Sequence, residues 1–486
     1  MSRFFIGYVV AGLVMLPFAA GAADSASSDV NAQLRAMQQR MSQMEDRLEA
    51  TTDKLDNANQ RLNAQTDLIH RAKLDQDSQS GVAAFLDTLE IGGWIAGGWN
   101  YNFHNPGGSN AAGANAGNLG FYPFHPDANT FSVDQAWFSL SRPTSEENRA
   151  GFQLDLVVGK TAALLNSLGY LGQSGSSFEF HMYQAYIEYL APIGPHGVTI
   201  QAGKMGTWIG KEVAQTVDNF NITRGNVYTL FQPITNVGIR AETELGGGVT
   251  VGAGVVNGTR SDADTEFTST RKAVVWKVAW SNDTFGAQFA GTHGQTSDAT
   301  FFSQFHASNG SLGSSQKETI YDLIFTWDPN EKFSGYINAD YINSENNARS
   351  LVTSTAAMFG APFLGDEVRG YGVAVGGRYA INERMGIALR GEWVDLDRKV
   401  FQNVRIYGIT GTLDYALTEH LKVRGEMRYD NSGSMNNAGP AGMAPFPKAF
   451  CGGRSSTCGT SYASGNSNSG GENNQLTTGV EVIYSF

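Results

Sequence analysis

Charged side chains occupy every second position in several stretches of this chain. The clearest run is Lys422, Arg424, Glu426 and Arg428, which are separated by apolar residues or Gly. In a β-strand this spacing places all four charges on one face. Such a face could contact ions or charged solutes, or its members could pair with one another. A salt-bridged wall is the more ordinary explanation, because Glu426 lies among three cations.

The same alternation identifies seven basic and seven acidic positions that would share such faces. The basic positions are Arg240, Lys277, Arg378, Arg390, Lys422, Arg424 and Arg428, and the acidic ones are Asp155, Glu188, Glu242, Asp322, Glu392, Glu426 and Glu481. Because the two sets are equal in number, they predict no preference for anions or cations.

No catalytic signature accompanies these charges. A hydrolytic site needs a nucleophile beside a base, and the sequence contains neither G-x-S-x-G nor H-E-x-x-H. The eight His are scattered along the chain. We therefore expect no enzyme, no metal site and no cofactor. The net charge of −12 also argues against a nucleic-acid partner.

The first residues have the layout of a secretory signal peptide. Arg3 precedes an almost wholly apolar stretch over 4–20, and the small residues Ala20 to Ala23 follow. Cleavage after Ala22 fits best, so we expect a signal peptide over 1–22. A retained membrane helix is the alternative, but it needs about 20 apolar residues and this run is marginal.

Export to an oxidising compartment bears on the two cysteines. Cys451 and Cys458 lie in a Gly- and Ser-rich stretch over 431–474, and in such a compartment the pair predicts a disulfide. A metal site would need more ligands than these two thiols.

Residues 30–72 predict a coiled coil. Apolar residues recur every seven positions, at Leu34, Met41, Leu48, Leu55, Leu62 and Ile69, with no Gly or Pro between. The matching d positions become polar towards the C-terminal half, so a single amphipathic helix remains the alternative. We expect this segment to lie in the periplasm and to support a homo-oligomer, with a trimer favoured.

From residue 90 to Phe486 the apolar residues follow a period of two. Tyr321, Leu323, Phe325 and Trp327, for example, alternate with polar and aliphatic residues. The predicted strands lie at 91–103, 130–141, 151–159, 179–190, 197–204, 235–244, 249–256, 271–281, 284–292, 318–328, 333–342, 369–380, 385–395, 404–416, 420–430 and 475–486. Aromatic residues stand at the ends of the apolar faces, the heights of the two membrane interfaces.

Connections alternate in length along these strands. Those after even-numbered strands are short, such as Asn282-Asp283 and Pro329-Asn330, whereas most of those after odd-numbered strands are long and rich in Gly, Ser and Asn. Short periplasmic turns and long external loops are typical of an outer-membrane barrel. We therefore expect an all-β, antiparallel transmembrane barrel over 90–486 with about 16 strands, where 14 or 18 would also fit. Its terminal aromatic, Phe486, is the residue type that the barrel-assembly machinery reads.

Region 90–258 resembles the OmpL-like putative β-barrel porin-2 family. The resemblance rests on GGWIAGGWNYNF at 92–103, DQAWFSL at 134–140, QAYIEYLAPIG at 184–194, QAGKMGTWIGKE at 201–212, DNFNITRG at 218–225, QPITNVGIRAE at 232–242 and VVNG at 255–258. It implies an outer-membrane pore for solutes that the family does not define. Beyond residue 258 the likeness is mostly the strand pattern.

A pore selects solutes at its narrowest ring of side chains. The best candidate is the long connection 205–234, which carries Lys211, Glu212, Asp218 and Arg224 besides four aromatic residues. This content suits a loop folded into the lumen, and a capped external loop is the alternative. We predict a Gram-negative outer-membrane porin for passive diffusion of small hydrophilic solutes or ions. A structural or adhesive barrel is the alternative function.

Deletion of residues 24–78 is expected to weaken oligomers while the barrel still inserts, because the heptad seam would supply much of the association. Native gels of the refolded protein would measure this, and an unchanged assembly would argue against the coiled coil.

Overall fold

The computed structural model describes residues 85–103, 124–125, 129–167, 180–259, 272–296, 316–345, 368–398, 404–431 and 474–486, with single positions at 42, 52, 54, 60 and 83. The chain divides into two compact units, Met1–Asp87 and Thr88–Phe486. The signal peptide, almost all of the coiled coil over 30–72 and the pair Cys451 and Cys458 lie outside the described residues. They remain predictions.

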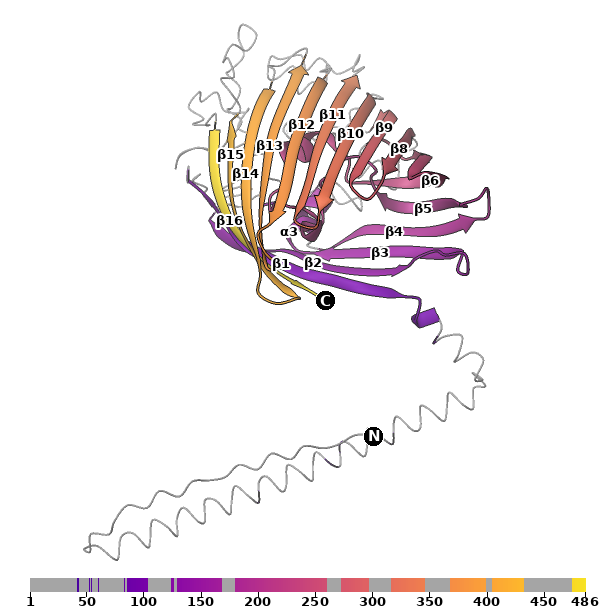
Figure 1. The fold of residues 1–486 in the computed structure, drawn as a ribbon, viewed down its shortest axis with the longest axis horizontal. Coiled ribbons are helices and arrows are strands. Elements are labelled where there is room, and N and C mark those ends of the chain that lie inside the picture. The colour runs from indigo at the N-terminus through magenta and orange to yellow at the C-terminus, as the bar shows by residue number, and fades with distance from the viewer. Residues whose placement is uncertain are drawn as a thin grey trace, which may run out of the picture. The chain divides into compact units, whose positions relative to one another are not determined.

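The second unit is a closed antiparallel barrel of sixteen strands (Figure 1). Each strand pairs with its neighbours in sequence, and β1 closes onto β16 with Trp94 opposite Ser485 and Asn102 opposite Thr477. The strands are β1 Glu90–Asn102, β2 Thr130–Arg142, β3 Ala150–Val158, β4 Phe180–Ala191, β5 Val198–Gly206, β6 Thr235–Gly246, β7 Val249–Val256, β8 Ala273–Ser281, β9 Phe285–Thr296, β10 Gln316–Asn330, β11 Phe333–Glu345, β12 Val368–Ala380, β13 Met385–Arg398, β14 Val404–Ala416, β15 Leu421–Asn431 and β16 Asn474–Ser485.

The predicted fold class, strand number and strand order are confirmed. The largest differences are at strand ends, where hydrogen bonding continues past the last residues of the sequence pattern. β10 extends two residues beyond each predicted end, and β13 continues to Arg398. β13 and β14 are therefore joined by residues 399–403 alone, which makes this the one short connection that follows an odd-numbered strand.

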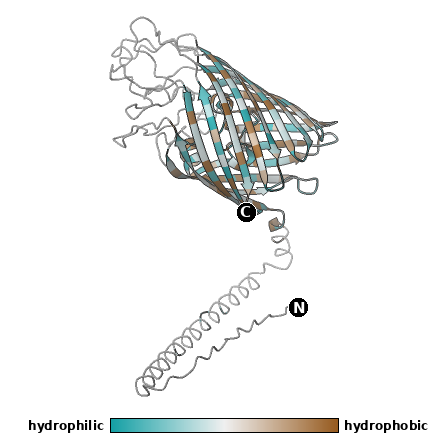
Figure 2. Cartoon of the chain, turned by 60° about the vertical axis from the view of Figure 1, so that its left-hand side comes forward, coloured by the Kyte–Doolittle hydropathy of each residue, from teal (hydrophilic) through white to brown (hydrophobic). Residues whose placement is uncertain are grey.

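Hydrophilic and hydrophobic residues alternate along the strands (Figure 2). Large apolar side chains are exposed on the outside of the barrel, whereas many charged ones are buried inside. Tyr321, Leu323 and Phe325 of β10 are exposed on the outer surface, whereas Asp322 between them is fully buried. Tyr321 and Tyr341, register partners on β10 and β11, lie with ring centroids 6.1 Å apart, and Tyr371 on β12 continues the row at 5.2 Å. This row forms part of an aromatic belt at a membrane interface.

Short helices lie inside the barrel, packed against the strands of its wall. α3, Lys160–Ser167, packs against β2, β3 and β4 through the buried residues Ala162 and Leu165, which contact Trp137 and Tyr183. The connection between β5 and β6 contains the 3-10 turn η2, Thr216–Asp218, and the helix α4, Asn226–Phe231. No helix among the described residues is both long and apolar enough to cross a bilayer.

The C-terminal residue completes the closing pair. The backbone N–H of Phe486 donates to the Gly93 carbonyl at 3.0 Å, and its own carbonyl accepts from Gly93 N–H at 3.1 Å. This residue is 56% exposed, on the outer surface.

Phe325→Lys should destabilise the folded barrel by roughly 2–4 kcal/mol, because it places a charge against lipid between Tyr321 and Trp327. Thr326→Lys is the matched control, since this neighbouring side chain points into the barrel and is partly accessible. Urea titration in lipid vesicles measures both variants, and equal losses would contradict the assignment of the two faces.

Candidate functional site

The connection between β5 and β6, residues 207–234, lies inside the barrel; we refer to it as the inner segment. Every residue from Asn221 to Gln232 is buried. Its apolar residues share a core with the inner faces of β9 to β14, where Ile209, Leu230 and Phe231 pack with wall residues such as Ile320 and Ile342. The inner segment is therefore part of the packed interior of the protein.

α4 packs against a part of β12 whose inward-facing residues are glycines. Gly370 and Gly372 occupy alternate inward positions, and a Cβ atom at Gly372 would come within 2.8 Å of the Phe231 ring. Val227 lies at the same position, within 3.2 Å of that Cβ. The absence of side chains on this part of the wall thus creates the space that the helix occupies.

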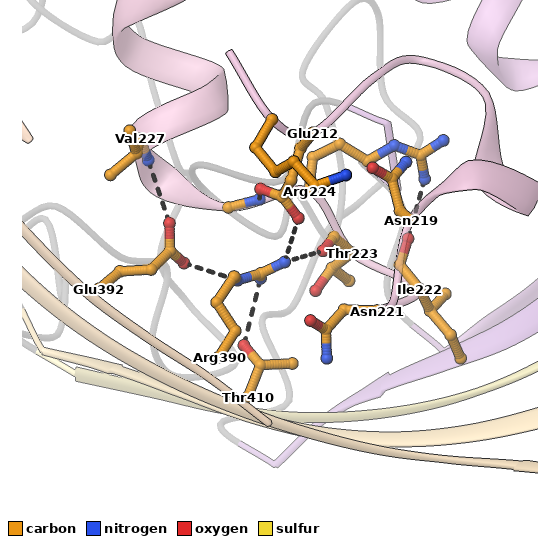
Figure 3. A network of polar contacts seen from close by, with 12 residues as sticks. Glu212, Asn219, Asn221, Ile222, Thr223, Arg224, Val227, Arg390, Glu392 and Thr410 are labelled. Atoms are coloured by element: carbon orange, nitrogen blue, oxygen red, sulfur yellow. Dashed lines mark hydrogen bonds and ion pairs between the residues drawn. The ribbon is translucent and has the colours of Figure 1, made fainter. Parts of the chain in front are cut away.

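Arg390 of β13 is the fully buried centre of the first polar contact between wall and segment (Figure 3). Its guanidinium pairs with Glu212 of the inner segment at 2.5 Å and with Glu392 of its own strand at 3.1 Å. It also donates to the Thr223 carbonyl at 2.7 Å and to the Thr410 hydroxyl at 3.2 Å. Two carboxylates and two neutral acceptors thus compensate one desolvated cation.

The two carboxylates beside Arg390 also hold the backbone of the inner segment. Glu392 accepts the Val227 N–H at 3.1 Å, in the first turn of α4. Glu212 accepts the N–H of Gly225, the N-cap residue of that helix, at 2.8 Å. The pair therefore fixes the start of α4 as well as the charge of Arg390.

Glu426 of β15 anchors the inner segment without a cation. Its carboxylate accepts the backbone N–H of Ile222 at 2.6 Å and of Thr223 at 3.0 Å. The hydroxyls of Thr223 and Thr412 add donations at 2.5 and 2.7 Å. Four donors satisfy this buried carboxylate, because hydrogen bonds to the charged form replace its hydration.

Arg424 of β15 makes a second buried ion pair. It donates to Glu481 of β16 at 2.8 Å and to the Thr216 hydroxyl at 2.6 Å, and that hydroxyl donates to Glu481 at 2.8 Å. Arg424 also donates to the Asn219 carbonyl at 3.0 Å. η2 is therefore fixed to the wall at the junction of β15 and β16.

Arg428, two inward positions beyond Arg424 on β15, makes a similar set of contacts. It pairs with Asp430 at 2.8 Å and donates to the Arg224 carbonyl at 2.6 Å. Asp430 in turn accepts from the side-chain amide of Asn226 at 2.7 Å. The three buried members of the charged run on β15, Arg424, Glu426 and Arg428, thus all bond to the inner segment.

Arg224, a predicted constriction residue, is buried inside the inner segment. It donates to the carbonyls of Val213 at 3.1 Å and of Ile222 at 2.8 Å, and to that of Ala214. Its guanidinium lies 4.9 Å from the centroid of the Phe124 ring. Burial lowers the pKa of Arg224 from its ordinary value, and these contacts make it a residue that shapes the segment.

Fewer of the predicted residues remain accessible inside the barrel. Lys211 is half-buried and Asp218 is exposed on the inner segment, whereas Arg240, Glu242, Arg378 and Lys422 are half-buried or exposed on the wall. Arg378 pairs with Asp414 at 2.7 Å. Glu188 on β4 and Lys277 on β8, also predicted, are half-buried as well.

Trp208 joins the inner segment to the opposite wall, on β6 and β8. The Arg240 guanidinium lies 4.5 Å and the Lys277 ammonium 4.9 Å from its ring, distances at which cation–π attraction is favourable. Lys277 also pairs with Glu242 at 2.5 Å.

Sequence reasoning missed the uncharged members of the site. Asn338 of β11, Thr216 and Thr223 of the inner segment and Asn226 of α4 all make anchoring hydrogen bonds. Gly370 and Gly372 gave a usable signal, because Gly at successive inward positions of a strand indicates close approach of another element.

A family model for "Putative beta-barrel porin-2, OmpL-like" proteins matches residues 88–486. The chain belongs to this family. The match extends the resemblance, which rested on region 90–258, over the whole barrel. The porin is an outer-membrane channel for passive diffusion, in agreement with its closed barrel, apolar exterior and polar interior.

Solved structures of outer-membrane proteins are similar to this porin in fold. They include the outer membrane channel DcaP of Acinetobacter baumannii, at 11% identity and a TM-score of 0.49 over 82% of this chain and 97% of that one. The anion-selective porin from Comamonas acidovorans matches at 12% identity and 0.48, over 82% and 99%. OmpT of Vibrio cholerae in its trimer form matches at 8% identity and 0.48, over 82% and 99%. No curated protein matches the sequence.

Arg390→Met is expected to release part of the inner segment, since it leaves Glu212 and Glu392 buried without their cation. Breaking such a pair costs about 3–5 kcal/mol. Thermal unfolding of the refolded porin would measure the loss. Arg378→Met is the matched control, because its half-exposed ion pair should contribute about 1 kcal/mol or less. Equal melting temperatures for the two variants would show that the buried network does not hold the segment.

Proposed function

We propose that the inner segment is the constriction of this porin and that solutes pass beside its accessible edge. The observation that carries the proposal is the uneven burial of the inward charges. Buried beneath the segment are Arg390 and Glu392 on β13, Arg424, Glu426 and Arg428 on β15, and Glu481 on β16. Arg240 on β6 and Lys277 on β8 are instead partly accessible, so the proposed aqueous path lies towards β6 and β8.

Charges of both signs would line this path. Lys211 and Asp218 come from the inner segment, and Arg240, Glu242 and Lys277 come from the wall. Side chains at the narrowest point of a pore determine which ions pass. This lining suits small hydrophilic solutes and ions of either sign, which enter without being bound tightly.

A non-catalytic role, which membership of the porin family supports, and a homo-oligomer complete the proposal. The heptad repeat over 30–72 supports association of several chains, with a trimer favoured. The exposed ring of Phe486, at the end of a strand, fits recognition by the barrel-assembly machinery, and the outer belt of tyrosines fits contact with outer-membrane lipid.

Single-channel recording in planar bilayers tests the channel itself. Stepwise open currents are expected from the refolded full chain, and the reversal potential in a salt gradient reports which sign of ion passes more easily. A silent bilayer with demonstrably folded protein would instead favour the structural or adhesive role.

Lys211→Glu should move the reversal potential towards cation preference, because it replaces a positive charge at the proposed constriction by a negative one. Lys332→Glu is the control, since it makes the same change in the exposed turn between β10 and β11. If both variants gave the same reversal potential, Lys211 would not face the path.

A further inference from the structure

The two ends of the inner segment meet at a single side chain, Asn338 of β11. Its Oδ1 atom accepts the backbone N–H of Lys211 at 3.0 Å and the Nε2 of Gln232 at 3.0 Å. Lys211 follows shortly after β5 ends at Gly206, and Gln232 shortly precedes the start of β6 at Thr235. Asn338 is 2% exposed and joins residues near the two ends of the inner segment. It lies on β11, five strands along the barrel from β6, where the segment ends.

Gly210 allows the two ends to approach this closely. Its φ of +94° lies in the region that favours glycine, and an added Cβ atom would come within 1.9 Å of the Gln232 side-chain oxygen. The contact therefore depends on the packing of the Gln232 amide directly on the Gly210 backbone.

Two carboxyl groups hold Asn338 in place. Its Nδ2 donates to Asp322 Oδ1 at 2.5 Å and to Asp340 Oδ2 at 3.3 Å. Asp322 on β10 and Asp340 on β11 are register partners, and they are 0% and 4% exposed. The two carboxyl groups thus share one side-chain amide, and Gln232 Nε2 also donates to Asp340 Oδ2 at 3.4 Å.

Two buried carboxyl groups that accept from the same amide favour a state in which one of them keeps its proton. If both groups were ionised, two like charges would lie close together in a buried site, which is strongly unfavourable. The register neighbours add no charge, since Ala290 of β9 lies opposite Asp322 and Gly372 of β12 lies opposite Asp340.

Few other titratable groups belong to the elements around this pair. Tyr336 is the nearest on the inward face of β11, and Lys211 is the nearest on the inner segment, where its ammonium lies 5.9 Å from the Phe220 ring. Glu212, the next residue, pairs with Arg390.

We propose that Asp322, Asn338 and Asp340 form a proton-dependent clamp that positions the constriction of this porin. The inference rests on the proposed function of the inner segment. While the carboxyl pair holds a proton, Asn338 is fixed and joins the two ends of the segment. When that proton is lost at higher pH, repulsion between the carboxylates displaces Asn338, and the segment moves more freely. The three are positioning residues, because none has to touch the solute.

Hydrogen exchange and single-channel recording of the full chain, at about pH 5 and about pH 9, test the clamp together. After correction for intrinsic exchange rates, protection of the peptide containing Gly210 and Lys211 should fall by about tenfold or more at the higher pH. Brief current fluctuations should become several-fold more frequent. Asp322→Asn and Asp340→Asn should abolish both changes, because an amide beside one carboxylate needs no shared proton. Asn338→Leu should remove the protection at both pH values.

Asp283→Asn is the matched control, since it makes the same substitution in an exposed turn and should retain the pH dependence of the wild type. A wild type with equal protection and equal fluctuations at both pH values would overturn the clamp, and so would unchanged pH dependence in Asp322→Asn. Absence of any current would count against the proposed function alone, because hydrogen exchange still reports on the clamp.

Discussion

Every backbone N–H and C=O group that lies at the depth of the hydrocarbon must find its partner within the protein. An open sheet would leave two edges unpaired there, so the sixteen strands must close, and the pairing of β1 with β16 satisfies both edges. Phe486 extends this pairing to the last residue of the chain. Closure also sets the width of the barrel, which at sixteen strands is too large for wall side chains alone to fill.

The interior of so wide a barrel is filled in part by the inner segment, and electrostatics determines where it lies. Burial beneath the segment removes water from Arg390, Arg424 and Arg428, and the wall supplies each of them with one carboxylate, from Glu392, Glu481 and Asp430 respectively. The segment supplies Glu212 to Arg390, the Thr216 hydroxyl to Arg424 and the Arg224 carbonyl to Arg428. The wall arginines and the segment therefore satisfy one another's buried polar groups. A buried ion pair adds little net stability, but loss of one partner is costly, so such contacts favour one position of the segment over others.

The sequence pattern assigned a face to the charged residues of this site and carried no signal for its uncharged ones. Alternation assigned Arg390, Arg424, Glu426 and Arg428 to the inner face, and they lie there. It could not show that the segment covers them, because an inward position in a strand reads the same whether water or protein faces it. Asn338 gave no signal, since one asparagine on an alternating strand does not reveal that two distant ends of a loop converge on it.

Period-two hydropathy, turn residues and alternating loop lengths predicted about sixteen strands, their order and their faces, and closure of the barrel fixed the number at sixteen. The physical reason is that each strand pairs with its neighbours in sequence, so local pattern and covalent order specify the meander, and closure specifies the rest. The tertiary structure alone decided which charges are buried and which remain accessible. Arg390 and Glu212 are 178 residues apart, and their contact depends on the path of residues 207–234 through the lumen, which no local periodicity encodes.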